Sequence, residues 1–188
     1  MDQNNTNKDT NKDTNQSQDH FQDMSSYGPS ILGLLSCYIL YKKPVLLFVY
    51  LFGYIINKLL NYFLKGTIKW PRPNEDMVKF MASMRLDNHI KNERYGMPSG
   101  GAQSMYYSLA FIYFSNLASC PQMICAYLIT LITLLTRIYL NHHSFAQIMV
   151  GSIIGLLSGY LFFYYSQMKI RGPIQIRAAI EDYIGINS

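Results

Sequence analysis

The stretch PVLLFVYLFGYIINKLLNYFL, residues Pro44–Leu64, decides the fold class of this chain. It contains one charged side chain, Lys58, and it is long enough to cross a bilayer as a helix, which takes about 20 mostly apolar residues. Three further apolar runs carry no charge: Ala102–Ser119, Pro121–Thr136 and Gln147–Met168. Such runs in a chain of 188 residues leave too little polar sequence to cover them as the core of a soluble protein. We therefore predict an integral membrane protein with four spans.

Two other features favour packed membrane helices. Gly151, Gly155 and Gly159 recur at every fourth position of the last run, which predicts a stripe where a neighbouring backbone approaches closely. Tyr27–Tyr41 is a shorter apolar run, which could span a thin bilayer, tilt into it or lie in its interface. The predicted fold is all-α, a polytopic membrane bundle of four to six helices.

The two ends of the chain are more polar than its middle. Residues 1–26 are rich in Asn, Asp, Gln, Lys and Thr and lack the apolar core of a signal peptide, so we expect a disordered tail there. The expected membrane-embedded domain covers residues 27–170. Residues 171–188 form a short C-terminal segment in this division of the chain.

Charge and cysteine content exclude several classes of function. The net charge is +5, but the basic residues are not concentrated on one soluble face and many lie at membrane borders, so no nucleic-acid binding is predicted. The three cysteines have neither metal-ligand spacing nor the pattern of a disulfide framework. Without Lys65, Arg72 and Arg137, Lys and Arg are equally numerous on the two predicted sides, so the positive-inside rule gives no orientation. No pattern indicates an oligomeric state.

Polar residues gather where the predicted helices begin and end. Successive helices of a hairpin cross the membrane in opposite directions, so the end of one helix and the start of the next lie at the same face. This topology alone brings five residues to one face of the membrane: Lys65, Arg72, Ser99, Arg137 and His143.

The chemistry of this set suits a phosphate. Ser99 and Gly100 follow Pro98 at the expected start of a helix, where free amide groups and the helix dipole favour an anion. Three cations would complete a phosphate site: Lys65, Arg72 and Arg137. His143 is a candidate nucleophile or base beside them. Each cation alone is better explained by contact with lipid headgroups, and only their convergence favours a site.

Three motifs follow one another in the chain: Lys65 with Arg72-Pro73, then Pro98-Ser99-Gly100, then Thr136-Arg137 with His143 and Gln147. They resemble the K-x6-R-P, P-S-G-H and S-R-x5-H-x3-D motifs of the type 2 phosphatidic acid phosphatase (PAP2) superfamily, which includes lipid phosphatases and vanadium haloperoxidases. Gly101 stands where the pattern has His, and Gln147 stands where it has Asp. The YGMPS stretch and Gln147 most resemble the dolichyl-diphosphatase branch.

The resemblance implies a PAP2/haloperoxidase-like fold and a mechanism without a metal or other cofactor. The implied substrate is a lipid phosphate or a polyprenyl diphosphate, cleaved at the face of an internal membrane such as the endoplasmic reticulum. The implied catalytic residues are His143, which forms a phosphohistidine, and Gln147, which orients the ring. The implied substrate-binding residues are Lys65, Arg72, Ser99, Gly100 and Arg137.

Gly101 leaves two interpretations open. In the family, the His at this position protonates the leaving oxygen. A diphosphate releases a weakly basic phosphate and needs this proton less than a monoester does, so the chain could be a diphosphatase. Alternatively, it is a pseudophosphatase that binds lipid phosphate without cleaving it. A transporter or channel is disfavoured, because apart from Lys58 no charged residue lies within a predicted span.

Overall fold

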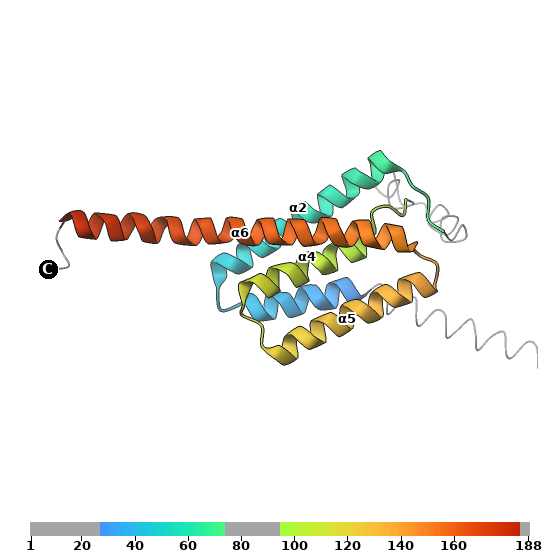
Figure 1. The fold of residues 1–188 in the computed structure, drawn as a ribbon, viewed down its shortest axis with the longest axis horizontal. Coiled ribbons are helices and arrows are strands. Elements are labelled where there is room, and N and C mark those ends of the chain that lie inside the picture. The colour runs from blue at the N-terminus through green and yellow to red at the C-terminus, as the bar shows by residue number, and fades with distance from the viewer. Residues whose placement is uncertain (1–26, 74–94, 185–188) are drawn as a thin grey trace, which may run out of the picture.

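The computed structural model describes residues 27–73 and 95–184, and within them the chain is all-α, as predicted. The helices are Tyr27–Leu40, α2 (Pro44–Ile68), α4 (Gly100–Ser115), α5 (Cys120–Tyr139) and α6 (Phe145–Ile184). In Figure 1, α4 runs between α6 and α5, and α6 extends past the other helices toward the C-terminus. The expected tail over residues 1–26 lies outside the described residues.

Three of the described helices are long and apolar enough to cross a membrane: Pro44–Ile68, Cys120–Tyr139 and Phe145–Met168 within α6. The fourth predicted span, Ala102–Ser119, is corrected by the structure. Its helix, α4, has 16 residues and ends before Asn116, whose φ of 53° is left-handed and stops the helix. At about 1.5 Å per residue such a helix reaches ~24 Å, less than the ~30 Å of a hydrocarbon core.

The short length of α4 is compatible with a membrane bundle because the other helices surround it. Most of its side chains are buried, from Ala102 near its start to Ile112 in its last turns. The short helix Tyr27–Leu40 closes one side of α4, since Leu32 packs with Met105, Leu109 and Ala126 in one apolar cluster. α4 is therefore enclosed largely by the neighbouring helices.

The glycine stripe of α6 packs against α4, which confirms the predicted close approach. A Cβ atom built on Gly151 would lie 2.5 Å from the carbonyl oxygen of Ser99, and one built on Gly159 would lie 2.5 Å from that of Tyr107. A Cβ atom on Gly155 would overlap the carbonyl oxygen of Gln103. The two backbones are therefore in contact along the first half of α4. Beyond the predicted end at Met168, α6 continues as a helix to Ile184, through most of the expected C-terminal segment.

Candidate active site

The candidate site lies at one end of the bundle, where α2 and α5 end and α4 and α6 begin. The short segments between these helices complete it. The backbone N–H of Gly96 donates to the carbonyl of Trp70 at 2.8 Å, and Pro71 and Tyr95 form an isolated antiparallel bridge. This pairing holds the segment that carries Arg72 against the segment that leads into α4.

His143 is held in one orientation by two acceptors. Its ring Nδ1 lies 3.1 Å from the carbonyl oxygen of Gly96 and 3.2 Å from Oε1 of Gln147. A carbonyl oxygen can only accept, so Nδ1 carries the hydrogen. The amide orientation of Gln147 is fixed as well, because its Nε2 donates to the carbonyl of Pro71 at 2.7 Å. Oε1 is therefore the atom that faces the ring, and it also accepts from the backbone N–H of Ser144 at 3.1 Å.

The other ring nitrogen of His143, Nε2, carries no hydrogen in this arrangement. With the hydrogen on Nδ1, Nε2 is unprotonated, and its lone pair accepts a hydrogen bond from Nη1 of Arg72 at 3.3 Å. The pKa of His143 is lowered to about 2 by burial first and then by the positive charges of Arg72, Arg137 and Lys65. A neutral imidazole next to cations that bind anions suits nucleophilic attack on a phosphate.

The start of α4 supplies a second part of the site. The backbone N–H of Ser99 donates to the carbonyl of Gln147 at 3.0 Å, so α4 begins directly beside α6. Ser99 is fully buried, and within the described ranges its Oγ has no hydrogen-bond partner. Gly100 is the first residue of α4, whose initial amide groups lack acceptors within the helix. A buried hydroxyl beside a helix start suits the binding of a phosphoryl oxygen.

Lys65 and Arg137 approach from the ends of α2 and α5. Lys65 lies in the last turn of α2 and is only 2% exposed, an unusual degree of burial for a lysine. Arg137 lies in the last turn of α5, where its backbone carbonyl accepts from the N–H of His142 at 3.0 Å. Both positive charges act on His143, as the lowering of its pKa indicates. The structure thus brings every predicted site residue to the same end of the bundle.

The space beside Gly101 is filled by a side chain from another helix, which the sequence did not indicate. A Cβ atom built on Gly101 would lie 2.5 Å from Cζ of Arg137 and 2.6 to 2.7 Å from its two terminal nitrogens. The Arg137 guanidinium therefore occupies the space next to position 101 that any larger side chain would need. A larger side chain at position 101 would require the guanidinium, the far end of the flexible Arg137 side chain, to move.

Several residues that hold the site were missed by sequence reasoning. Asn61 donates through Nδ2 to the carbonyl of Pro98 at 3.2 Å and to Oε1 of Gln103 at 2.7 Å. Nε2 of Gln103 then donates to Oδ1 of Asn57 at 2.9 Å. The available signal was the recurrence of Asn57, Asn61 and Lys65 at every fourth position of an otherwise apolar helix, which places them on one buried face.

Gly96 is a further missed residue, and it requires a glycine for steric reasons. A Cβ atom there would lie 2.5 Å from both amide atoms of Gln147, the residue that holds the His143 ring. A side chain at this position would push the amide away from its place between Pro71 and His143. As for metals, the described residues contain no group of three or more His, Cys, Asp or Glu side chains that could hold an ion.

Comparisons of the sequence with a family profile and with known proteins agree on one family. The sequence profile of the PAP2 superfamily matches residues 46–171. A dolichyldiphosphatase of Saccharomyces cerevisiae is 34% identical over 122 residues, which are 60% of this chain and 48% of the yeast protein. Dolichyldiphosphatase 1 of Homo sapiens is 25% identical over 156 residues, which are 75% of this chain and 61% of the human protein.

A third relative, from Schizosaccharomyces pombe, is a palmitoyl-protein thioesterase-dolichyl pyrophosphate phosphatase fusion. It is 28% identical over 154 residues, 76% of this chain and 22% of the fusion protein. The chain thus spans about half to three-fifths of the length of the yeast and human relatives. No solved structure matches it. Because the profile match covers nearly all of α2, all of α4 and α5 and the first part of α6, the chain belongs to the PAP2 superfamily.

Proposed function

We propose that the protein is an integral-membrane lipid phosphatase that hydrolyses a polyprenyl diphosphate, such as a dolichyl-like diphosphate, through a phosphohistidine at His143. The observation that carries the proposal is the state of the His143 ring. Its Nδ1 hydrogen is directed to Gly96 and Gln147, which leaves the Nε2 lone pair beside Arg72. Membership of the PAP2 superfamily and the similarity to dolichyldiphosphatases support the same reaction class.

The proposed first step is an in-line displacement at the terminal phosphorus. Nε2 of His143 forms the N–P bond while the bond from phosphorus to the bridging oxygen breaks. The phosphoryl oxygens bind to Lys65, Arg72, Arg137, the Ser99 hydroxyl and the Gly100 amide. These donors stabilise the charge that spreads over the equatorial oxygens in the transition state.

Water completes the reaction by attacking the phosphohistidine. The N–P bond breaks, inorganic phosphate leaves, and neutral His143 is restored with its hydrogen still on Nδ1. During the first step Nε2 becomes positive, and the imidazolium donates from Nδ1 to the carbonyl of Gly96 and to Oε1 of Gln147. Neither acceptor carries a net charge, so both stabilise the imidazolium less than the Asp of the family pattern would.

The leaving group explains how the reaction proceeds without an acid at position 101. A diphosphate releases a phosphate monoester anion, which is far less basic than an alkoxide and needs no immediate proton. The guanidinium of Arg137, in the space beside Gly101, supplies a positive charge where the anion develops. This argument favours a diphosphate over a lipid monophosphate as substrate.

The second candidate function is a pseudophosphatase that binds a lipid phosphate without cleaving it. Gly101 is the observation that favours it, because general acid catalysis contributes typically 10²–10⁴-fold to such reactions. In this case the cations and the Ser99 helix start would form a binding site only.

A substrate panel on the purified full chain in lipid nanodiscs separates these functions. A polyprenyl diphosphate, an isoprenoid diphosphate and phosphatidic acid are compared by phosphate release. We expect the two diphosphates to be cleaved faster than phosphatidic acid, and His143→Ala to reduce the rate by at least about 10³-fold.

His142→Ala is the matched control, because it removes the neighbouring imidazole and should keep most of the activity. Wild-type protein that binds the diphosphate but releases no phosphate would establish the pseudophosphatase instead. Acid-labile labelling from a diphosphate with a radioactive terminal phosphate, lost in His143→Ala, would identify the intermediate.

A further inference from the structure

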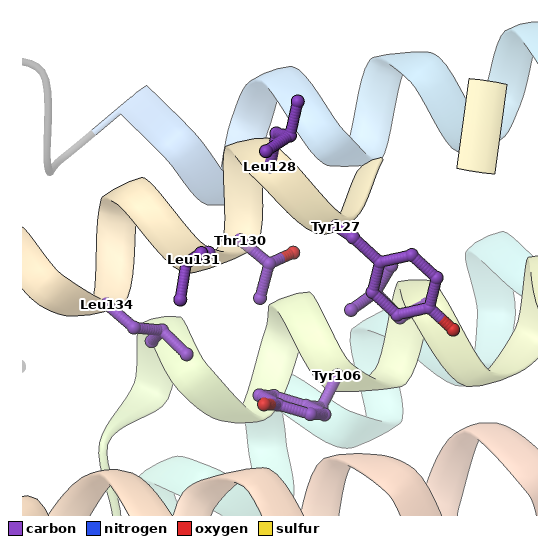
Figure 2. A pocket seen from close by; sticks show the side chains of 7 residues that line it. Tyr106, Tyr127, Leu128, Thr130, Leu131 and Leu134 are labelled. Atoms are coloured by element: carbon purple, nitrogen blue, oxygen red, sulfur yellow. The ribbon is translucent and has the colours of Figure 1, made fainter. Parts of the chain in front are cut away.

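A groove lies between α4 and α5, on the side of α4 that faces away from α6. Its volume is about 280 Å³. Its walls come from Tyr106 and Leu109 of α4 and from five residues of α5: Tyr127, Leu128, Thr130, Leu131 and Leu134. Figure 2 shows Tyr106 of α4 below the α5 side chains Thr130, Leu131 and Leu134, with Tyr127 beside them.

The lining is chemically suited to a hydrocarbon. Four of its side chains are leucines, and the two tyrosines, Tyr106 and Tyr127, offer the carbon surface of their rings. Thr130 is the other polar residue, and its hydroxyl already donates to the carbonyl of Ala126 at 2.8 Å, so it has no need of a polar ligand. Apolar burial is therefore the interaction that this groove offers.

One end of the groove reaches the candidate active site. Leu134 and Tyr106 line the groove, and both also pack in the apolar cluster that contains Ala102. Ala102 directly follows Gly101, and Leu134 lies one helical turn before Arg137. An apolar chain attached to a phosphate bound at Arg137 is therefore close to this end of the groove.

The groove is also open to the bilayer. Tyr127, Leu128 and Leu131 are 52%, 50% and 54% exposed in the chain, and they lie on a helix long and apolar enough to span a membrane. From Tyr127 to Leu134 the helix rises by ~10 Å, at about 1.5 Å per residue. The groove can thus take the first part of a long chain from the side, while the remainder stays in the lipid.

We propose that the α4–α5 groove binds the hydrocarbon chain next to the phosphate of the polyprenyl diphosphate substrate. The proposal rests on the proposed function, which it deepens by assigning where substrate specificity for a long chain arises. Catalysis needs only the phosphate end, so the groove should affect long-chain substrates and leave a substrate without a chain unchanged. An ordinary bilayer lipid in the groove is the competing occupant.

The first test blocks the groove and varies the length of the substrate's hydrocarbon chain. Leu131→Trp places an indole at the open side of the groove, where lipid exposure allows the larger side chain. Ile132→Trp is the matched control, since Ile132 is equally exposed at 54%, is adjacent on α5 and does not line the groove. We compare kcat/KM for a polyprenyl diphosphate and for methyl diphosphate in nanodiscs.

We expect Leu131→Trp to lower kcat/KM for the polyprenyl diphosphate about tenfold, as loss of one side chain's apolar contact would, without changing that for methyl diphosphate. Ile132→Trp should change neither value. Equal loss for both substrates, or no loss for either, overturns the groove proposal. A wild-type protein that cleaves neither substrate refutes the proposed function, and the groove is then decided by the second test.

The second test measures binding of a polyprenyl phosphate and does not depend on turnover. A polyprenyl phosphate with a photoreactive diazirine on the isoprene unit next to the phosphate is irradiated with the wild-type protein in nanodiscs, and the labelled peptides are mapped. We expect labelling of the groove walls, at Tyr106, Leu109 or residues 127–134, that unlabelled polyprenyl phosphate removes and that Leu131→Trp reduces. Labelling elsewhere, or equal labelling by a diazirine-bearing phosphatidylcholine, means that only bilayer lipid occupies the groove and contradicts the proposal.

Discussion

The two sides of α4 differ in how they are packed. Toward α2 and α6, the backbone of α4 lies against Gly151, Gly155 and Gly159, and its Gln103 is hydrogen-bonded to Asn57 and Asn61. Toward α5, the contact is apolar and leaves the groove open between Tyr106 and Leu131. One side is close-packed and carries the buried hydrogen bonds of Gln103, and the other is looser and apolar.

This difference would separate two tasks of the proposed phosphatase. The close-packed side fixes the start of α4, because Asn61 holds Pro98 and the carbonyl of Gln147 holds Ser99. The proposed phosphate-binding groups are thereby placed without help from a substrate, which would lower the cost of ordering them on binding. The looser side leaves room for a flexible chain. Arg137, at the end of α5, is where the two sides meet beside Gly101.

The largest effect should come from Gly101→Ala, which tests that meeting point. The new methyl group needs the space of the Arg137 guanidinium, so we expect the rate of diphosphate cleavage to fall by about 10²-fold, as after loss of one transition-state donor. The rate and the melting temperature are measured together, to confirm that the variant folds.

A double-mutant cycle shows whether displacement of Arg137 causes the loss of activity in Gly101→Ala. In an Arg137→Ala background, Gly101→Ala should have little further effect, because the displaced group is already absent. Additive losses would mean that Gly101 acts through the α4 backbone and not through Arg137.

Gly155→Ala tests the close-packed side directly. Its Cβ atom would meet the backbone of Gln103 and Tyr107, which cannot rotate away, so we expect the free energy of unfolding to fall by about 1–3 kcal/mol. Gly33→Ala is the control, because the nearest atom to its Cβ is 4.0 Å away, and it should be neutral or stabilising. Denaturation in mild detergent gives both values, and equal stability of the two variants would refute the difference in packing.

Asn61→Leu removes the hydrogen bonds that attach α2 to the start of α4. Oε1 of Gln103 and the carbonyl of Pro98 would lose a buried donor, at a cost of about 1–2 kcal/mol in stability. The diphosphate rate should fall as well, because Ser99 follows Pro98 directly. Leu59→Ala, on a lipid-exposed position of the same helix, should change neither quantity. A fully active, stable Asn61→Leu would show that the glycine contacts alone position α4.

The smallest effect is the pH dependence of stability that His143 causes. Its pKa is about 2 in the folded protein, below the ~6.5 of an unfolded chain, so the unfolded state binds more protons between these values. Stability from this group is present above pH 6.5 and is lost as the pH falls. Between pH 7 and pH 6 the loss is about 0.7 kcal/mol. His143→Gln should remove this part of the slope, as measured by unfolding at both pH values; an unchanged slope would contradict the low pKa.

The sequence by itself determined the membrane class, the helical bundle and the end of the bundle that carries the site. Long runs with few charges fix helices in a bilayer because every backbone polar group must be satisfied within the helix. The alternation of helix directions then brings Lys65, Ser99 and His143 together. The spacing of Gly151, Gly155 and Gly159 also predicted close contact with a neighbouring helix, because the period of a helix is a local property.

The tertiary structure alone decided the features that depend on segments far apart in the chain. The end of α4 before Asn116 and its enclosure by other helices are examples, since hydropathy does not distinguish a spanning helix from a buried one. The hydrogen on Nδ1 of His143 depends on the carbonyls of Gly96 and Pro71, which only the pairing of two loops places. Likewise, the motif comparison indicated only that Gly101 replaces a His. The structure shows that the Arg137 guanidinium fills the space beside it. Side-chain orientation follows from such long-range contacts, and no local pattern encodes them.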